Sequence, residues 1–246
     1  MTQRSSIPRA DIAIVVPVLD DVSALAGLLG AIARWPRQPA EVVVVAADPS
    51  EELGALVAAE GRCLLECPAN RGGQLDHGAR HARSQILWFL HADVEVPGDA
   101  LGAIERAVAN GAEGGCLRFS FQGPSTWYKR AISRLVALRI RCGGVAYGDQ
   151  GLFALREVYL ALGGFPPEPL FEEVRLVRGL KRRGTFRMLG TRIGVSTRRW
   201  DRDGWWTRTW HNRWLAVCFA LGVPAKRLAG AYQRQRLSPT RMKNPG

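Results

Sequence analysis

Short apolar runs alternate with amphipathic segments over the first part of the chain. The apolar runs have the length of β-strands and lie at 12–18, 41–46, 62–67 and 86–90. The segments between them, at 25–35, from 50 onward and at 72–82, repeat apolar residues at the spacing of one helix face. This alternation predicts an α/β fold with a mostly parallel sheet and right-handed crossovers.

The second half of the chain is less regular. Strands are predicted at 115–121 and 151–155, and helices at 126–140 and 172–184. The last of these helices begins with Glu172 and Glu173, two carboxylates that suit the positive end of a helix dipole.

Tryptophan is concentrated near the C-terminus. Trp210, Trp214 and Val217 form a helical stripe that leads into an apolar run at 214–223. That run is too short to cross a bilayer. We expect it to dock on the core, and the alternative is that it lies in a membrane interface.

The chain has 246 residues, of which 47% are apolar and 23% charged. This composition suits one large domain, and we predict a tail at 1–11, a domain at 12–200 and a basic helical extension at 201–246. The first apolar segment is too short for a signal peptide or a membrane span. The five cysteines are scattered, which favours reduced thiols and a cytoplasmic protein.

The net charge of +12 lies almost entirely in the last third of the chain. Residues 170–246 hold 18 Lys and Arg against 4 Asp and Glu, whereas residues 1–169 hold 16 against 18. A basic patch of this size can hold a diphosphate, an anionic lipid surface or a nucleic acid backbone. A solvated basic face is the alternative.

The predicted strand at 86–90 breaks abruptly into two polar side chains, His91 and Asp93. Ligands of open α/β sheets collect beyond the carboxyl ends of the strands. Residues two apart in an extended chain point to the same side, so His91 and Asp93 can face one divalent cation or one diphosphate. The alternative is a turn in which Asp93 only precedes a helix that starts near Pro97.

Several short blocks occur in an order that resembles the signature of the family-two glycosyltransferases. They lie at 14–21, 71–76, 90–93, 148–153, 163–166, 172–173 and 196–200. The likeness is greatest to the radical-SAM/selenodomain-associated, or arsenosugar biosynthesis, subgroup, whose members carry His-Ala-Asp in place of Asp-x-Asp. The resemblance implies a GT-A fold, with a Rossmann-like sheet flanked by helices, and an inverting transfer of sugar from a nucleotide diphosphate to an acceptor hydroxyl or carboxyl.

The same resemblance implies roles for individual residues. Asp93 corresponds to the last acid of the family's metal motif and is the expected ligand of Mg²⁺ or Mn²⁺, and His91 is expected to complete the metal shell or to contact the nucleotide. Glu172 and Glu173 correspond to the family's acidic pair, with Glu173 in the usual position of the catalytic base. The remaining positions expected to bind the nucleotide sugar are Pro17, Leu19, Asp21, Arg71, Gln74, Arg198, Arg199 and Trp200. Ala46 stands where many relatives carry a uracil-reading Asp, which leaves the nucleotide base open.

Alternatives to a transferase with a small acceptor remain. The basic, Trp-rich end of the chain also suits an enzyme at the inner membrane face with a lipid or carotenoid acceptor. A sugar-nucleotide nucleotidyltransferase would need a glycine-rich loop after the first strand, where this chain has no glycine before Gly27. A basic nucleic-acid-binding module is a third possibility, but no nucleic-acid motif, P-loop or dinucleotide fingerprint is present.

Overall fold

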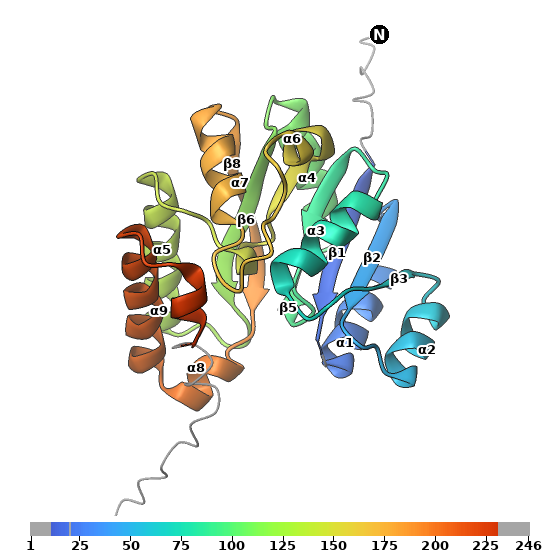
Figure 1. Cartoon of the computed structure of the whole chain (residues 1–246), viewed down its shortest axis with the longest axis horizontal. Helices are drawn as coiled ribbons and strands as arrows, with labels where there is room; N and C mark the ends of the chain where they lie inside the picture. The colour runs from blue at the N-terminus through green and yellow to red at the C-terminus, as the bar shows by residue number, and fades with distance from the viewer. Residues whose placement is uncertain (1–10, 20, 231–246) are drawn as a thin grey trace, which may run out of the picture.

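The computed structural model describes residues 11–19 and 21–230. Its eight strands form one sheet in the order β3-β2-β1-β4-β7-β6-β8-β5 (Figure 1). The strands are β1 (Ile12–Val18), β2 (Glu41–Ala46), β3 (Cys63–Glu66), β4 (Ile86–Phe89), β5 (Val94–Glu95), β6 (Gly114–Phe121), β7 (Phe153–Leu155) and β8 (Phe186–Val195). All except β5 and β7 run in one direction, which confirms a mostly parallel sheet.

Helices cover both faces of the sheet. One face carries α1 (Val22–Ala33), α2 (Glu51–Ala59) and α4 (Ala100–Ala109), and the other carries α3 (Arg71–His81), α5 (Trp127–Arg141), α6 (Arg156–Ala161) and α7 (Val174–Arg182). Side chains of a strand alternate between its faces. In β1, Ile14 and Val16 therefore pack in the first core and Ala13 and Val15 in the second.

α1, α2 and α3 begin a few residues after β1, β2 and β3, and each has a polar N-cap. The side chains of Asp21, Ser50 and Asn70 accept hydrogen bonds from the backbone N–H groups three residues on, at 3.0, 3.2 and 2.8 Å. The turns between strand and helix are consequently short. They keep Asp21 and the start of α3 close to the carboxyl edge of the sheet.

β5 and β8 were not predicted from the sequence. β8 contains Arg187, Gly190, Arg192 and Gly194, which interrupt any apolar run, and much of the strand is only half-buried. Its partners decide its conformation, since it pairs in parallel with β6 and antiparallel with the two-residue β5. The carboxyl end of β8 delivers residues 196–200 to the same edge as the end of β4.

The C-terminal segment forms α8 (Arg198–Asp203) and α9 (Trp205–Ala220). The run at 214–223, which was expected to dock on the core, docks only through one side, because Trp214 and Val217, with Trp210 before them, are 54%, 56% and 67% exposed. α9 packs through its opposite face, where Leu215 is buried and Phe219 stacks on Phe171 at 4.5 Å. None of the described helices is long and apolar enough to cross a bilayer.

Parts of two predicted segments lie outside the described residues. These are residues 1–10 of the tail predicted at 1–11 and residues 231–246 of the extension predicted at 201–246.

Gly78 allows α3 to lie close against the sheet. A Cβ at this position would lie 2.6 Å from Val15 Cγ1 and 2.8 Å from Val45 Cγ2. We expect Gly78→Ala to lower the free energy of unfolding by about 1–3 kcal/mol, because the helix must shift outward. Urea denaturation measures this. The matched control is Gly54→Ala in α2, where a Cβ meets nothing within 4 Å and where a gain of about 0.5–1 kcal/mol is expected; equal effects of the two substitutions would contradict the close packing.

Candidate active site

The predicted site residues meet at one edge of the sheet because of the strand directions. β1, β4 and β8 all end there, followed by Asp21, by His91 and Asp93, and by Arg198. The antiparallel β7 begins at this edge, so the segment just before it, at 148–151, lies there as well. The fold thereby collects four sequence blocks that are far apart in the chain.

An outer cluster consists of Asp21, Asp93 and Arg198. The Arg198 Nη2 atom donates to Asp21 Oδ2 at 3.0 Å and lies 3.9 Å from Asp93 Oδ2. Burial acts to raise the pKa of Asp21, but hydrogen bonds from Ala24, Ser23 and Arg198 outweigh it and lower that pKa. The cluster is partly open to solvent, with 35% of the Asp93 side chain exposed. Two carboxylates therefore lie close to one guanidinium in the part of the site that is open to solvent.

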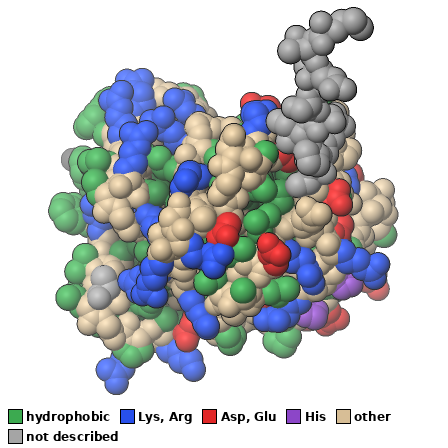
Figure 2. All heavy atoms as spheres, turned by 90° about the horizontal axis from the view of Figure 1, so that it is seen from above, with side chains coloured by type: hydrophobic (Ala, Val, Ile, Leu, Met, Phe, Trp, Pro, Cys, Tyr) green, Lys and Arg blue, Asp and Glu red, His purple; other side chains and the backbone are tan. Residues whose placement is uncertain are grey.

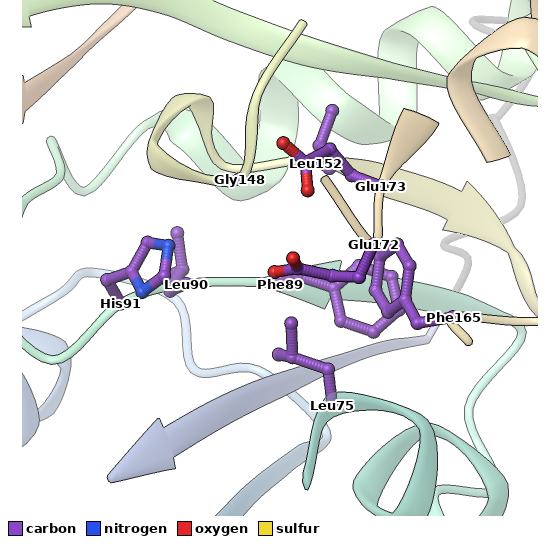
Figure 3. Close-up of a pocket in the computed structure, with 9 residues that line it drawn as sticks. All are labelled: Leu75, Phe89, Leu90, His91, Gly148, Leu152, Phe165, Glu172 and Glu173. Carbon is purple, nitrogen blue, oxygen red and sulfur yellow. The ribbon is translucent and has the colours of Figure 1, made fainter. Parts of the chain in front are cut away.

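An inner pocket lies behind the end of β4. Figure 3 shows His91, Glu172 and Glu173 around one hollow whose other walls are mainly apolar, from Leu75, Phe89, Leu90, Leu152 and Phe165. Its volume is about 10 Å³, which is room for about one water molecule. A sugar does not fit this hollow, so the lining segments must move apart before any larger molecule reaches Glu173.

Arg71 and Glu172 form an ion pair beside the hollow. The Glu172 side chain is 1% exposed, and both of its oxygens accept from Arg71, one of them from Nη2 at 2.9 Å. A two-bond pair between guanidinium and carboxylate is strong and directional. Arg71 thereby fixes Glu172 and joins the start of α3 to the segment before α7.

Glu173 lacks such a partner. Its side chain is buried, and its Oε2 atom has no hydrogen-bond partner among the residues that the structure describes. Burial, the neighbouring charge of Glu172 and the charge of Asp149 raise the pKa of Glu173 to about 8, although Arg71 opposes this. A carboxyl group in this state can exchange a proton near neutral pH, as a general base or acid must.

His91 is held in its neutral form. Burial first, and then the positive charges of Arg71 and Arg199, lower its pKa to about 3. A neutral imidazole keeps one ring nitrogen free to accept a hydrogen bond or to bind a metal ion. A Cβ on Gly148 would lie 3.3 Å from His91 Nε2, so the 148–151 segment closes over the ring.

Asp149 belongs to the site, although the sequence patterns assigned it no role. It lies in the short 3₁₀ turn η1 (Gly148–Gln150). Burial raises its pKa against the charges of Arg139, Arg71 and Arg199. The guanidinium of Arg139 stacks on the Tyr147 ring at 4.4 Å. The available signal was the 148–153 block itself, whose only acidic residue is Asp149.

Two further contacts fix the segment that carries the glutamates. Tyr159 accepts from the Phe165 N–H at 2.9 Å and donates to Asp76 of α3 at 2.9 Å, which anchors the 163–166 block. Phe171 has φ 63°, a left-handed conformation that is costly for a bulky residue. Its ring lies 5.9 Å from Tyr147 and 4.5 Å from Phe219 of α9. The position of Glu172 and Glu173 thus depends on α3, η1 and α9 together.

The remaining predicted residues divide between the site and the scaffold. The amide of Gln74 is buried and donates to the carbonyls of Val18 and Val45 at 2.9 and 3.0 Å, which joins the ends of β1 and β2. Pro17 lies within β1, and Leu19 is 61% exposed just beyond it. Trp200 points into an aromatic cluster, with its ring 5.0 Å from that of Phe121.

Arg199 lies near enough to the inner pocket for its charge to lower the pKa of His91. Ala46, at the end of β2, is 1% exposed, and Asp48 has φ 55°. No cluster of three or more His, Cys, Asp or Glu side chains able to hold a metal ion occurs in the part of the chain that the structure describes.

Comparison with protein families identifies the class of protein. The model of glycosyl transferase family 2 matches residues 13–160, more than half of the chain. The chain belongs to this family and is a glycosyltransferase. This result disfavours the nucleotidyltransferase and nucleic-acid-binding alternatives. The comparison with curated proteins gives no match.

Solved structures share the fold. A mycobacterial protein is 19% identical over 76% of this chain and 66% of its own, just under two thirds, with a TM-score of 0.57. The glucosyl-3-phosphoglycerate synthase of Mycobacterium tuberculosis, solved with Mn²⁺, uridine diphosphate and glucosyl-3-phosphoglycerate, is 18% identical over 76% of this chain and 71% of its own, also with a TM-score of 0.57. At this identity the likeness shows the fold, and the predicted GT-A fold is confirmed.

The buried Glu173 makes stability depend on pH. Its pKa of about 8 lies above the ordinary value of 4.5. As the pH rises, the unfolded chain therefore loses this proton first, and the free energy of unfolding falls between these two values. Glu173→Gln removes the effect. Above pH 8 we expect the variant to be more stable than the wild type by up to about 5 kcal/mol, the product of this pKa shift and about 1.4 kcal/mol per pKa unit.

Calorimetric melting across this pH range measures the difference. It should shrink as the pH falls and vanish below pH 4.5, where the carboxyl is protonated in both states. The exposed Glu157→Gln in α6 is the control and should follow the wild type at every pH. Parallel pH profiles for wild type and Glu173→Gln would contradict the buried, protonated state.

Proposed function

We propose that the protein is a metal-dependent, inverting glycosyltransferase that moves a sugar from a nucleotide diphosphate to an acceptor hydroxyl. The observation that carries the proposal is the pairing of a buried Glu173, with a pKa of about 8, and an outer cluster of Asp21, Asp93 and Arg198 at the same sheet edge. The first can take a proton from an acceptor, and the second can bind an anionic leaving group together with a cation.

The outer cluster suits a divalent cation and a diphosphate. Asp93 of the outer cluster offers a hard, partly exposed carboxylate and His91, at the adjacent inner pocket, a neutral imidazole, and these residues would hold Mg²⁺ or Mn²⁺ together with oxygens of the phosphates. Such a cation would neutralise charge on the departing diphosphate. Arg198 and Arg199 would bind phosphate oxygens through their planar forks. The synthase from Mycobacterium tuberculosis was solved with Mg²⁺ or Mn²⁺ and uridine diphosphate, which supports this assignment.

The inner pocket supplies the base. Glu173 in its ionised form removes the proton of the acceptor hydroxyl as the oxygen attacks the anomeric carbon, and the ion pair of Glu172 with Arg71 holds the neighbouring carboxylate away from that role. Attack from the face opposite the diphosphate is a single displacement and inverts the anomeric centre. Assistance from a general base contributes typically about 10²- to 10⁴-fold.

Finer assignments are also proposals. We assign the chain to the radical-SAM/selenodomain-associated subgroup because of the His91-Ala92-Asp93 block, and we divide it into a catalytic domain at 12–200 and an extension from 201. Ala46 leaves the nucleotide base unassigned. The acceptor is either a small polar molecule or a lipid or carotenoid reached at the cytoplasmic face of the membrane; the exposed face of α9 favours the second.

Substitution of Glu173 tests the base. We expect Glu173→Gln to lower kcat by about 10²- to 10⁴-fold and to leave the affinity for nucleotide diphosphate unchanged, because the outer cluster is intact. Product formation from a panel of nucleotide sugars, with calorimetric titration of the nucleotide, measures both. The exposed Glu157→Gln is the control. Full activity of Glu173→Gln would remove Glu173 from this role.

Thermal shift tests the metal and the nucleotide together. Each nucleoside diphosphate is added with and without Mn²⁺ to the wild type and to Asp93→Asn. A ligand that binds only the native state raises the Tm, by an amount equivalent to about 2.7 kcal/mol at 100 times its Kd. We expect one base to give the largest shift and to require Mn²⁺ for it, and we expect this Mn²⁺-dependent shift to be lost in Asp93→Asn. A metal-dependent shift that survives in the Asn variant would show that Asp93 is not a ligand.

A further inference from the structure

α9 has its most apolar face turned outward. The outer face carries Trp206, Trp210, Trp214, Val217 and Leu221, which are 70%, 67%, 54%, 56% and 80% exposed. Their spacing of three or four residues places them in one stripe. The inner face holds Arg208 and Leu215, each 3% exposed. An ordinary surface helix has the reverse arrangement, with its apolar stripe on the core.

α5 adjoins α9 and extends this apolar surface. Trp127, Leu135 and Leu138 of α5 are 68%, 49% and 55% exposed. The two helices lie side by side (Figure 1), and the rings of Tyr128 and Trp205 are 4.7 Å apart. Figure 2 shows apolar side chains along the left edge of the molecule, where α5 and α9 lie, with Lys and Arg among them. We call the exposed apolar residues of both helices the aromatic surface.

The charges on α5 and α9 have one sign, and the neighbouring acids of α8, Asp201 and Asp203, contact Trp205 and Arg208. α5 contains five Lys and Arg and α9 contains two, and neither helix contains an Asp or a Glu. Arg130, Arg134, Arg141 and Arg213 are exposed beside the apolar side chains. A symmetric contact with a second copy of the chain would bring these arginines against each other, and like charges across an interface are unfavourable. The surface instead requires an apolar and negatively charged partner.

We propose that the aromatic surface docks on a lipid bilayer that contains anionic lipids. Tryptophan is enriched at the boundary between headgroups and acyl chains, where its ring is apolar and its N–H stays hydrated. Arginine can lay its alkyl chain along apolar surface and keep its guanidinium among the headgroups. A helix with aromatic residues on one side and basic residues around them lies in the plane of the interface. The exposed tryptophans and the acid-free helices thus have one common explanation.

Docking would bring the membrane near the loop that contains Phe171, Glu172 and Glu173. Phe219 lies on the opposite side of α9 from Trp210 and stacks on Phe171, the residue before Glu172. A helix with its side chains is about 10–12 Å wide, so about one helix would separate that loop from the bilayer. If the proposed function holds, this placement suits an acceptor dissolved in the membrane, whereas docking itself requires no catalytic activity.

Co-sedimentation with vesicles tests the docking. The full chain is mixed at low salt with vesicles of phosphatidylcholine alone or of phosphatidylcholine and phosphatidylglycerol in equal parts, without nucleotide or acceptor. We expect binding only to the anionic vesicles. High salt should weaken it, since the Debye length falls from about 10 Å at 0.1 M to about 3 Å at 1 M. Absence of binding to the anionic vesicles at low salt would overturn the proposal.

Two variants separate the apolar and the charged contributions. Trp206→Ala/Trp210→Ala/Trp214→Ala should weaken binding at least about tenfold through lost apolar burial. Arg130→Gln/Arg134→Gln/Arg213→Gln should weaken it roughly 100-fold, because each basic residue near an anionic surface contributes about fivefold. The matched control, Arg34→Gln/Arg83→Gln/Arg106→Gln, changes three exposed arginines away from α5 and α9 and should stay within about twofold of the wild type. Equal losses in the control and the arginine variant would show a nonspecific charge effect and overturn the surface assignment.

Fluorescence quenching and light scattering locate the lipid contact and detect self-association. Brominated acyl chains should quench the fluorescence of the wild type more than that of the tryptophan variant, in which Trp127 is the exposed tryptophan that the aromatic surface retains, and equal quenching of both would place the contact elsewhere. Light scattering without lipid should show the same mass for the wild type and the tryptophan variant. A larger wild-type mass that falls in the variant, without vesicle binding, would assign the surface to self-association. Thermal melting checks that each variant folds, and lost transfer activity with vesicle binding retained would count only against the proposed function.

Discussion

The site depends on the interaction of two adjacent buried carboxylates, Glu172 and Glu173, with the guanidinium of Arg71. Arg71 holds Glu172 in place through two hydrogen bonds, so the buried Glu173 lies beside a carboxylate of fixed position. The consequence is a pKa of about 8 for Glu173 and a carboxyl group that changes protonation near neutral pH. Holding such a group inside the protein costs stability, which functional sites commonly tolerate.

Contacts from several parts of the fold hold Glu172 and Glu173 in position. The start of α3 contributes Arg71, the end of β4 contributes His91, and the turn before β7 contributes Asp149, so three separate connections converge on the glutamates. Phe171 is kept in a left-handed conformation between Tyr147 and Phe219. Since these contacts come from distant parts of the chain, the hollow at Glu173 opens only if several of them shift together.

The excess of positive charge in the last third of the chain has two locations. Arg198 lies between the acids of the outer cluster, and Arg199 acts electrostatically on His91 and Asp149. Arg213 lies on the outside of α9 among exposed tryptophans. On our proposals, the arginines at the sheet edge bind phosphate, and those on the aromatic surface bind lipid headgroups.

The sequence alone determined the parts that depend on local patterns. The strands at 12–18 and 41–46 are continuous apolar runs and form where they were predicted, and the helix N-caps at Asp21 and Ser50 are local hydrogen bonds. The ordered blocks, including His91-Ala92-Asp93 and Glu172-Glu173, identified the family that the comparison then confirmed.

The tertiary structure decided whatever depends on distant partners. β8 has too many arginines and glycines to be recognised as a strand and forms because β6 and β5 supply its hydrogen bonds. Gln74 and Trp200 matched the family pattern, yet in the structure they contact the framework of the fold. Gln74 donates to the carbonyls of β1 and β2, and Trp200 packs on Phe121. The spacing of Trp210, Trp214 and Val217 predicted that these side chains share one face of a helix, but not which way that face points. A period of 3.6 residues specifies which side chains lie together and nothing about their surroundings. The packing of Leu215 and Phe219 decides which side of the helix meets the core.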